Sequence, residues 1–357
     1  MRVGVKNNVK FTKTDTLALK GIAICMMLFH HLFAFPERIP VGLNIVDISV
    51  GGYDLSYIIA AFCKMCVAVY IYLGGYGTFL SFHGAADRKK KLRQKVINLY
   101  LTYWEIVVII VPISFVLKTN SFNITTFIKT LLGVSHAYCS EWWFFLPYVI
   151  VTIIYAFISK VFERQRCPCV DIVAVIVLRV LLAARQIYLP EKLLQFTPVG
   201  ILLSGMDFLP GFLLGAISAK YSYLDKIKQY VIANSMNNMV SAFFAVGITL
   251  LIFWFRVQIG GAYDAILAAL LVPMLSILLS ISEKSTCNFV LISLGQKSTI
   301  MWLVHTFYCY QFLPRILFSL KIPLIIFSAL VGISFVTAIP LEWLDKLVKA
   351  YLLKHKE

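Results

Sequence analysis

Two adjacent histidines and a lysine lie within the first long apolar stretch of the chain, at about residues 17–35. A neutral imidazole is the usual general base in proteins, so this stretch could carry proton-transfer chemistry. Lys20 and His31 are eleven residues apart, which on an α-helix places them on one stripe, separated by about 16 Å along the axis. His30 faces about 100° away from that stripe. The spacing favours His31 as the base; in the alternative reading Lys20 extends to the headgroups and the histidines make structural contacts.

Further ionisable residues lie within later apolar stretches, where a charge costs roughly 2.5–3.5 kcal/mol on insertion scales and usually marks a site. Lys64 is expected near the depth of His31, where it would keep a histidine neutral or extend outward to the interface. His305 is either a second polar group of the same site or a buried histidine with a local partner. Three others are Glu105, Arg179 and Asp207, and for the last two we favour structural ion pairs between helices.

A run of positive charge between the second and third apolar stretches is denser than elsewhere in the chain. It reads Asp87-Arg88-Lys89-Lys90-Lys91-Leu92-Arg93-Gln94-Lys95. Such a segment binds anionic lipid headgroups or the phosphates of a nucleotide-containing molecule. The candidate phosphate-binding residues in this loop are Arg88, Lys90, Lys91 and Arg93.

The composition indicates what kind of fold must position these residues. The chain has 60% hydrophobic and 14% charged residues, against about 45–50% and 25% in soluble domains. Only helices or closed barrels satisfy their backbone hydrogen bonds in lipid, and the apolar runs are continuous rather than alternating, which excludes a barrel. The predicted fold class is therefore all-α, a polytopic membrane helix bundle.

About ten transmembrane helices are predicted, and the lysines and arginines orient them. With both termini inside, 22 of these residues fall on inner segments and 8 on outer ones, as the positive-inside rule requires. The net charge of +16 therefore mostly reflects the orientation of the helices in the membrane, and we expect no nucleic acid partner. The loops are too short for a core of their own, so residues 1–357 are expected to form one integral-membrane domain. The predicted spans are residues 17–35, 57–82, 96–117, 142–159, 170–188, 198–219, 236–255, 262–281, 298–314 and 322–341.

The eight cysteines do not indicate a metal site. Cys167 and Cys169 lie together in an inner loop, but a structural zinc site needs a second ligand pair, and the sequence offers none nearby. We therefore predict no metal and no permanently bound cofactor.

Several segments, in order along the whole chain, resemble the membrane-bound acyltransferase 3 family. Its first helix has a basic residue, ten intervening residues and a histidine, as do Lys20 and His31. The chain departs from the family pattern in two places: the basic loop lacks a strict Arg-x-x-Arg, and Glu141 stands alone where some members have two acids. The other similar segments are Val67–Tyr76, Trp142–Leu146, Phe208–Gly215, and Leu294–Ser298 with Val304-His305.

The resemblance implies an enzyme that transfers an acyl group other than aminoacyl, most often acetyl, from acyl-coenzyme A to a hydroxyl of a surface polysaccharide or lipid-linked glycan. Acetyl-coenzyme A would be the donor substrate, and the protein would lie in the bacterial cytoplasmic membrane. His31 and Lys20 would be catalytic, with Lys20 nearer the donor phosphates, and a polar cavity would connect them. The substrate-binding candidates are Lys64, Glu141, Trp142 and His305.

Three alternatives stay open at this stage. A transporter or glycan-export protein without acyl-transfer chemistry would also need polar helices and a central histidine. Trp142 would border the acceptor entrance and could stack on a sugar ring, or could serve only as an interface anchor. A covalent acyl relay would need a nucleophile, and the sequence shows no convincing one.

Overall fold

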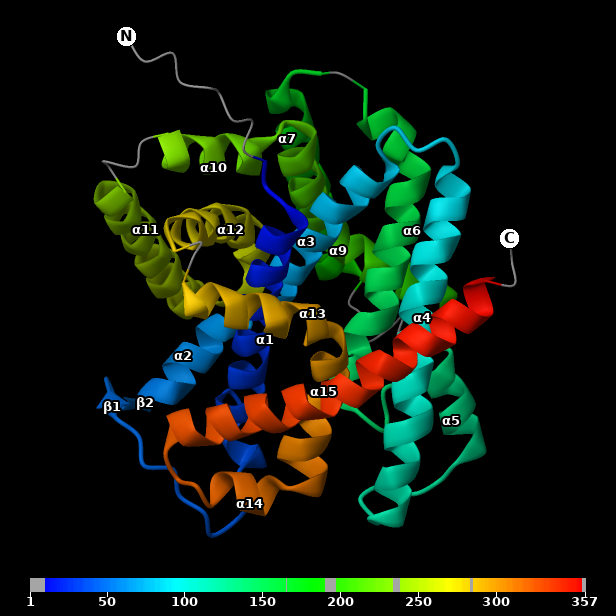
Figure 1. Cartoon of the computed structure of the whole chain (residues 1–357), viewed down its shortest axis with the longest axis vertical. Coiled ribbons are helices and arrows are strands. Elements are labelled where there is room, and N and C mark those ends of the chain that lie inside the picture. Colours follow the sequence, from blue (N-terminus) through cyan, green and yellow to red (C-terminus); the bar gives the residue numbers. More distant parts are fainter. Residues whose placement is uncertain (1–9, 165, 190–196, 234–237, 283–284, 355–357) are drawn as a thin grey trace.

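The computed structural model describes residues 10–164, 166–189, 197–233, 238–282 and 285–354 as a bundle of helices (Figure 1). One small antiparallel sheet, β1 (Ser49–Val50) and β2 (Tyr53–Asp54), pairs Ser49 with Asp54 in the segment after the first helix. The all-α fold class predicted from composition is confirmed.

The described residues up to Leu189 form nine helical elements, including two short 3-10 helices. They are α1 (Lys13–Phe33), η1 (Pro36–Arg38), α2 (Leu55–Cys63), α3 (Cys66–Phe82), α4 (Arg88–Val116), α5 (Ile124–Leu131), η2 (Ser140–Phe144), α6 (Phe145–Phe162) and α7 (Pro168–Tyr188). The stretch predicted as one span at 57–82 is interrupted at Lys64 and Met65, so that it forms α2 and α3. The basic run predicted as a loop instead begins helix α4 at Arg88, with Asp87 as the N-cap.

The described residues of the second half form nine further helical elements, one of which is a π-helix. They are α9 (Pro198–Lys220), α10 (Tyr223–Ala233), α11 (Asn238–Ile259), η4 (Gly260–Tyr263), α12 (Asp264–Ile281), α13 (Thr286–Thr306), the π-helix η5 (Phe307–Phe312), α14 (Pro314–Phe318) and α15 (Pro323–Lys354). Helices α11 and α12 pack against each other on either side of the short η4 turn.

Seven helical segments of the described chain are long and apolar enough to cross a membrane, which makes this a multi-pass membrane protein. The predicted number of ten is not confirmed. Residues 239–281 form a single candidate segment in this count although they contain both α11 and α12. Helices α7 and α13 fall outside it; α7 carries Asp171, Arg179 and Arg185, and α13 carries Lys297 and several polar residues.

Helix α1 lies at the centre of the bundle and packs against α13, α2 and α3 (Figure 1). Its start is fixed by a capping box, in which the Thr12 side chain and Asp15 each accept a hydrogen bond from the other's backbone N–H. Lys228 of α10 forms an ion pair with Asp15, with an Nζ–Oδ1 distance of 2.9 Å. These contacts satisfy the exposed N–H groups of the first turn and hold α1 against α10.

Glycines let α1 and α13 approach until their backbones touch. A Cβ atom placed on Gly295 would lie 1.8 Å from the carbonyl oxygen of Leu17, and one on Gly21 would lie 2.0 Å from that of Leu291. Only small residues allow helices to pack this closely in membranes. The glycine at 295, which belongs to one of the family-like segments, is therefore explained by this contact.

A second pair of helices, α3 and α9, meets in the same way. A Cβ atom on Gly75 would lie 1.8 Å from the carbonyl oxygen of Phe212, and one on Gly215 would lie 1.9 Å from that of Tyr72. The two glycine contacts join α1 with α13 and α3 with α9, and most of the buried apolar residues between Phe11 and Leu341 belong to one core cluster.

We predict that Gly295→Ala destabilises the protein because the added methyl group would separate α1 from α13. We expect a lower thermal unfolding midpoint in detergent, and a loss of about 1–3 kcal/mol, which is the usual cost of overpacking. Gly332→Ala in α15 is the matched control, since a Cβ there meets nothing within 4 Å. Equal midpoints for the two variants would contradict the close approach.

Candidate active site

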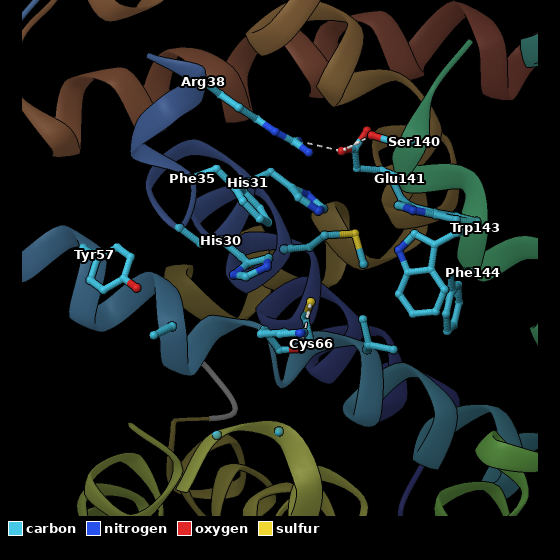
Figure 2. Close-up of a pocket in the computed structure, with 18 of the residues that line it drawn as sticks. His30, His31, Phe35, Arg38, Tyr57, Cys66, Ser140, Glu141, Trp143 and Phe144 are labelled. Atoms are coloured by element: carbon cyan, nitrogen blue, oxygen red, sulfur yellow. Dashed lines mark hydrogen bonds and ion pairs between the residues drawn. The ribbon is translucent and has the colours of Figure 1, made fainter. Parts of the chain in front are cut away.

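A cavity of about 570 Å³ lies at the C-terminal end of α1; we call it the histidine cavity. Its walls come from α1 and the following turn, the junction of α2 with α3, η2, the turn between α11 and α12, and α13. The residues that line it include His30, His31, Phe35, Arg38, Tyr57, Lys64, Ser140, Glu141, Trp143, Phe144, Arg256 and Trp302. Figure 2 shows the two histidines, Arg38 and Glu141 around it.

His31 and His305 form a direct hydrogen bond, although they are 274 residues apart in sequence. The distance from His31 Nδ1 to His305 Nε2 is 2.7 Å. The other ring nitrogen of His305, Nδ1, lies 2.8 Å from the carbonyl oxygen of Trp302. His305 is fully buried, whereas His31 lines the histidine cavity and is partly exposed.

These contacts fix the tautomers of a neutral histidine pair. A carbonyl oxygen can only accept, so His305 Nδ1 carries the hydrogen and donates it to Trp302. His305 Nε2 is then an acceptor, and His31 Nδ1 must donate to it. The remaining nitrogen of His31, Nε2, keeps its lone pair, which is the arrangement that a general base requires.

His30 is held differently from its neighbour. Its Nδ1 donates to the carbonyl oxygen of Ala60 at 2.8 Å, which ties α1 to α2. The ring is buried but still contributes to the wall of the histidine cavity. This contact gives His30 a structural task, as the alternative reading of the sequence expected.

Arg38 and Glu141 form an ion pair at the rim of the histidine cavity (Figure 2). The distance from Arg38 Nη1 to Glu141 Oε1 is 2.8 Å, and the Ser140 hydroxyl donates to the same oxygen at 2.6 Å. Burial opposes the positive charge of Arg38, but the hydrogen bonds and charge interactions with Glu141 and Tyr310 together outweigh it and raise the pKa of the guanidinium above its ordinary value. Arg38 therefore stays charged beside the histidines.

Sequence analysis missed Arg38, because it was counted only among the outer charges. The guanidinium lies 4.4 Å from the ring centre of Phe35 and 4.5 Å from that of Tyr310. The Tyr310 hydroxyl also donates to the backbone carbonyl of His31. Tyr310 belongs to the π-helix η5, an irregularity that often occurs at functional sites. The one sequence feature that could have indicated Arg38 as a site residue is its position only seven residues after His31.

The two tryptophans of the Trp142-Trp143 pair take opposite positions. Trp142 is 1% exposed, and its indole N–H donates to the carbonyl oxygen of Leu303 at 3.0 Å. Trp143 is 44% exposed and lines the histidine cavity. The expectation that Trp142 borders the acceptor entrance is therefore corrected: the residues form the 3-10 helix η2, which turns Trp142 into the core and Trp143 outward.

Lys64 lines the histidine cavity, at the interruption between α2 and α3. Its side chain is exposed, and it lines the same cavity as His31. Glu141, which was also expected near the acceptor, is only 7% exposed and is engaged by Arg38. The structure thus brings His31, His305, Lys64 and Glu141 into one region.

Lys20 lines a second cavity of about 120 Å³, which we call the lysine cavity. Tyr70, Tyr148 and Ser298 contribute to its walls. It shares Met27, Phe144 and Trp302 with the histidine cavity, so the two are neighbours along α1. Lys20 and His31 therefore lie on adjoining cavities, instead of the single connecting cavity that was expected.

Lys95 lies close to Lys20, and sequence analysis did not single it out. Its Nζ donates to the hydroxyl of Thr78 on α3, and its charge interacts with that of Lys20. Because α4 begins at Arg88, Lys95 lies two turns into the helix, well inside the bundle. The position of Lys95 inside the bundle could not be foreseen as long as residues 87–95 were predicted to form a loop.

The four residues predicted to bind phosphate lie on the first two turns of α4. Arg88 is engaged in the bundle, with Nη2 at 2.6 Å from Glu163 and Nη1 at 3.1 Å from the Ser159 hydroxyl. Lys90, Lys91 and Arg93 are exposed. They are available to a ligand, whereas Arg88 primarily ties α4 to α6.

The ion pairs expected between helices are present for one of the two residues. Asp207 of α9 forms an ion pair with Arg185 of α7. Arg179 instead donates to the backbone carbonyl of Ala262 at 2.8 Å. All eight cysteines are free thiols, and within the described residues no group of three or more His, Cys, Asp or Glu is arranged to hold a metal ion.

Fold and site together define a multi-pass helical membrane protein with a histidine pair beside a polar cavity. The family profile described as an acyltransferase domain matches residues 18–343. The chain therefore belongs to the acyltransferase 3 family, as its motifs indicated, and is an acyltransferase. Searches of curated proteins and of solved structures find no match.

We predict that His305→Ala lowers the turnover number of acyl transfer about 10- to 100-fold, because His31 loses the acceptor that fixes its tautomer. The KM for the acyl donor should change little. Steady-state kinetics of the purified protein test this, with His136→Ala as a control that removes a histidine from outside the histidine cavity. A His305→Ala enzyme with an unchanged turnover number would refute this role of His305.

Proposed function

We propose that the protein transfers an acetyl group from acetyl-coenzyme A to a hydroxyl of a cell-surface polysaccharide or of a lipid-linked glycan precursor. The observation that carries this proposal is the hydrogen-bonded chain from His31 through His305 to the carbonyl of Trp302, which leaves His31 Nε2 as an acceptor at the wall of the histidine cavity. Acyl transfer to a sugar hydroxyl needs a base in that state.

In the proposed reaction, the glycan hydroxyl oxygen attacks the thioester carbonyl carbon while its proton moves to His31 Nε2. The tetrahedral intermediate then collapses, the carbon–sulfur bond breaks, and the proton passes from His31 to the departing thiolate of coenzyme A. The products are the glycan ester and free coenzyme A, and His31 returns to its neutral state. Arg38, held by Glu141 at the same cavity, supplies positive charge for the oxyanion.

The donor is proposed to enter from the side where α1 begins. Lys90, Lys91 and Arg93 would bind its phosphates, Lys20 and Lys95 would lie along its path in the lysine cavity, and the thioester would reach His31 past the shared walls. That side, with both termini, is proposed to face the cytoplasm of a bacterial cell, and the lysine and arginine bias supports this orientation. The acceptor would occupy the histidine cavity from the outer side, where Trp143 is exposed.

We predict that His31→Ala abolishes acetyl transfer while the protein still inserts into the membrane, because the ring that accepts the proton is lost. The measurement is transfer of radiolabelled acetyl groups from acetyl-coenzyme A to envelope glycan in membranes, with immunoblotting for insertion. His30→Ala is the matched control and should retain most activity, since its ring is bonded to Ala60. Transfer near the wild-type level in His31→Ala would refute the assignment.

The same assay separates the enzyme from a transporter. A transporter would move glycan across the membrane without any acetyl group appearing on it. Consumption of acetyl-coenzyme A that depends on His31 and on added glycan supports the enzyme, whereas glycan movement without acylation supports the transporter.

We predict that replacing Lys90, Lys91 and Arg93 with Gln raises the KM for acetyl-coenzyme A by about tenfold. Exposed ion pairs are screened by salt, so raising the ionic strength should weaken donor binding in the wild type but have a smaller effect in the variant. Arg88→Gln serves as a contrast: it should lower the stability of the protein, because the ion pair between Arg88 and Glu163 is lost. An unchanged KM in the triple variant would leave these residues only a lipid-binding role.

A further inference from the structure

A third cavity, of about 200 Å³, opens beside the histidine cavity; we call it the side cavity. It lies between α3, α7, α9 and the start of α12. The two cavities share Lys64, Trp143 and Gly261 as wall residues. A molecule bound at His31 can therefore extend past Trp143 into the side cavity.

The carboxylates that line these two cavities are all engaged by arginines. Glu141 is bonded to Arg38 at 2.8 Å, and Asp264 to Arg256 with an Nε–Oδ1 distance of 2.5 Å. The third carboxylate, Asp207, forms an ion pair with Arg185. Each negative charge at the cavity walls is thus already balanced by one positive charge.

Two further cations at the side cavity have no such partner. Within the described residues, no carboxylate lies within ion-pair distance of Lys64 or of Arg179. Arg179 is held by the hydrogen bond to the carbonyl of Ala262, which leaves its other N–H groups available. The side cavity therefore carries an excess of two positive charges, and an anion bound there would relieve their mutual repulsion.

We propose that the side cavity binds an anionic group of the acceptor glycan, a carboxylate or a phosphate, on the unit next to the one that is acylated. Lys64 and Arg179 make the charge-assisted hydrogen bonds to that group. Trp143, at the junction of the two cavities, stacks against the intervening sugar ring, and Gln186 adds a polar side chain to the wall. This inference rests on the proposed function, because it assigns the acceptor to the histidine cavity.

The test uses envelope glycan from the cells that carry the gene, stripped of its esters with mild alkali and divided into three samples. One is left untreated, one has its carboxylates reduced to alcohols, and one has its phosphates removed. Binding of each sample to the purified protein in phosphatidylcholine nanodiscs is measured without acetyl-coenzyme A, and acetyl transfer to each is measured separately. The variants are Lys64→Gln with Arg179→Gln, and Lys129→Gln as a control for loss of an exposed charge outside the cavities.

We expect the untreated glycan to bind about tenfold more tightly than one of the two neutralised samples, which tells carboxylate from phosphate. The double variant should bind the untreated glycan only as tightly as the neutralised one, and Lys129→Gln should behave as wild type. Equal binding of all three samples by the wild type would overturn the proposal. So would a double variant that still prefers the charged glycan.

A lipid headgroup is the other source of such an anion, and it gives a different result. If phosphatidylglycerol added to the nanodiscs weakens glycan binding in the wild type and not in the double variant, the cations serve lipid, and the proposal is overturned. Charge-dependent binding without any acetyl transfer would leave the anionic subsite standing but remove the proposed function. Acetyl transfer that is independent of glycan charge would support the proposed function but overturn the anionic subsite.

Discussion

The contact on which the site depends is the close approach of α1 and α13. The glycines that touch, Gly21 and Gly295, are 274 positions apart, and so are the hydrogen-bonded histidines, His31 and His305. The two helices therefore run in the same direction and keep one register over ten residues, about 15 Å of helix. The backbone contact at one end holds the two imidazoles within hydrogen-bond distance at the other. A wider spacing of the helices would separate the rings and leave His305 without a side-chain partner.

The charges around the histidine pair follow from the cost of burial. A cation or carboxylate removed from water must be paired or hydrogen-bonded, and the arginines near the cavities meet this condition with Glu141, Asp264 and Asp207. These ion pairs also join segments that are distant in sequence: the turn after α1 to η2, and α7 to α9. The excess positive charge, on Lys64 and Arg179, therefore lies at defined positions on the cavity wall, and the ion pairs hold the surrounding helices in place.

The sequence was sufficient for features that depend on local periodicity. The helical class, the stripe that joins Lys20 to His31, and the family could all be predicted from spacing and apolar patterning. Features that depend on tertiary contacts could not. The partner of His31 lies 274 residues away, and no local pattern distinguishes His305 as a hydrogen-bond partner from His305 as an isolated buried ring. Trp142 was assigned to the acceptor entrance because it begins the predicted span of 142–159, whereas it lies in the 3-10 helix η2 with its side chain in the core. Lys95 was overlooked because α4 begins at Arg88, eight residues before the predicted span of 96–117.

Departures from regular α-helix are concentrated around the histidine cavity. Helices α2 and α3 are separated at Lys64 and Met65, η2 precedes α6, η4 separates α11 from α12, and the π-helix η5 begins two residues after His305. Within a membrane, irregular backbone is tolerated where it is buried in protein or lines a polar cavity, because its unpaired groups find partners there. Regular α-helices would also carry their side chains past the cavity at fixed angles of about 100°. The interruptions instead let Lys64, Trp143 and Tyr310 approach the cavity and His31 from three different segments of the chain. The irregular elements are therefore what converts a bundle of apolar helices into a site with polar groups on several sides.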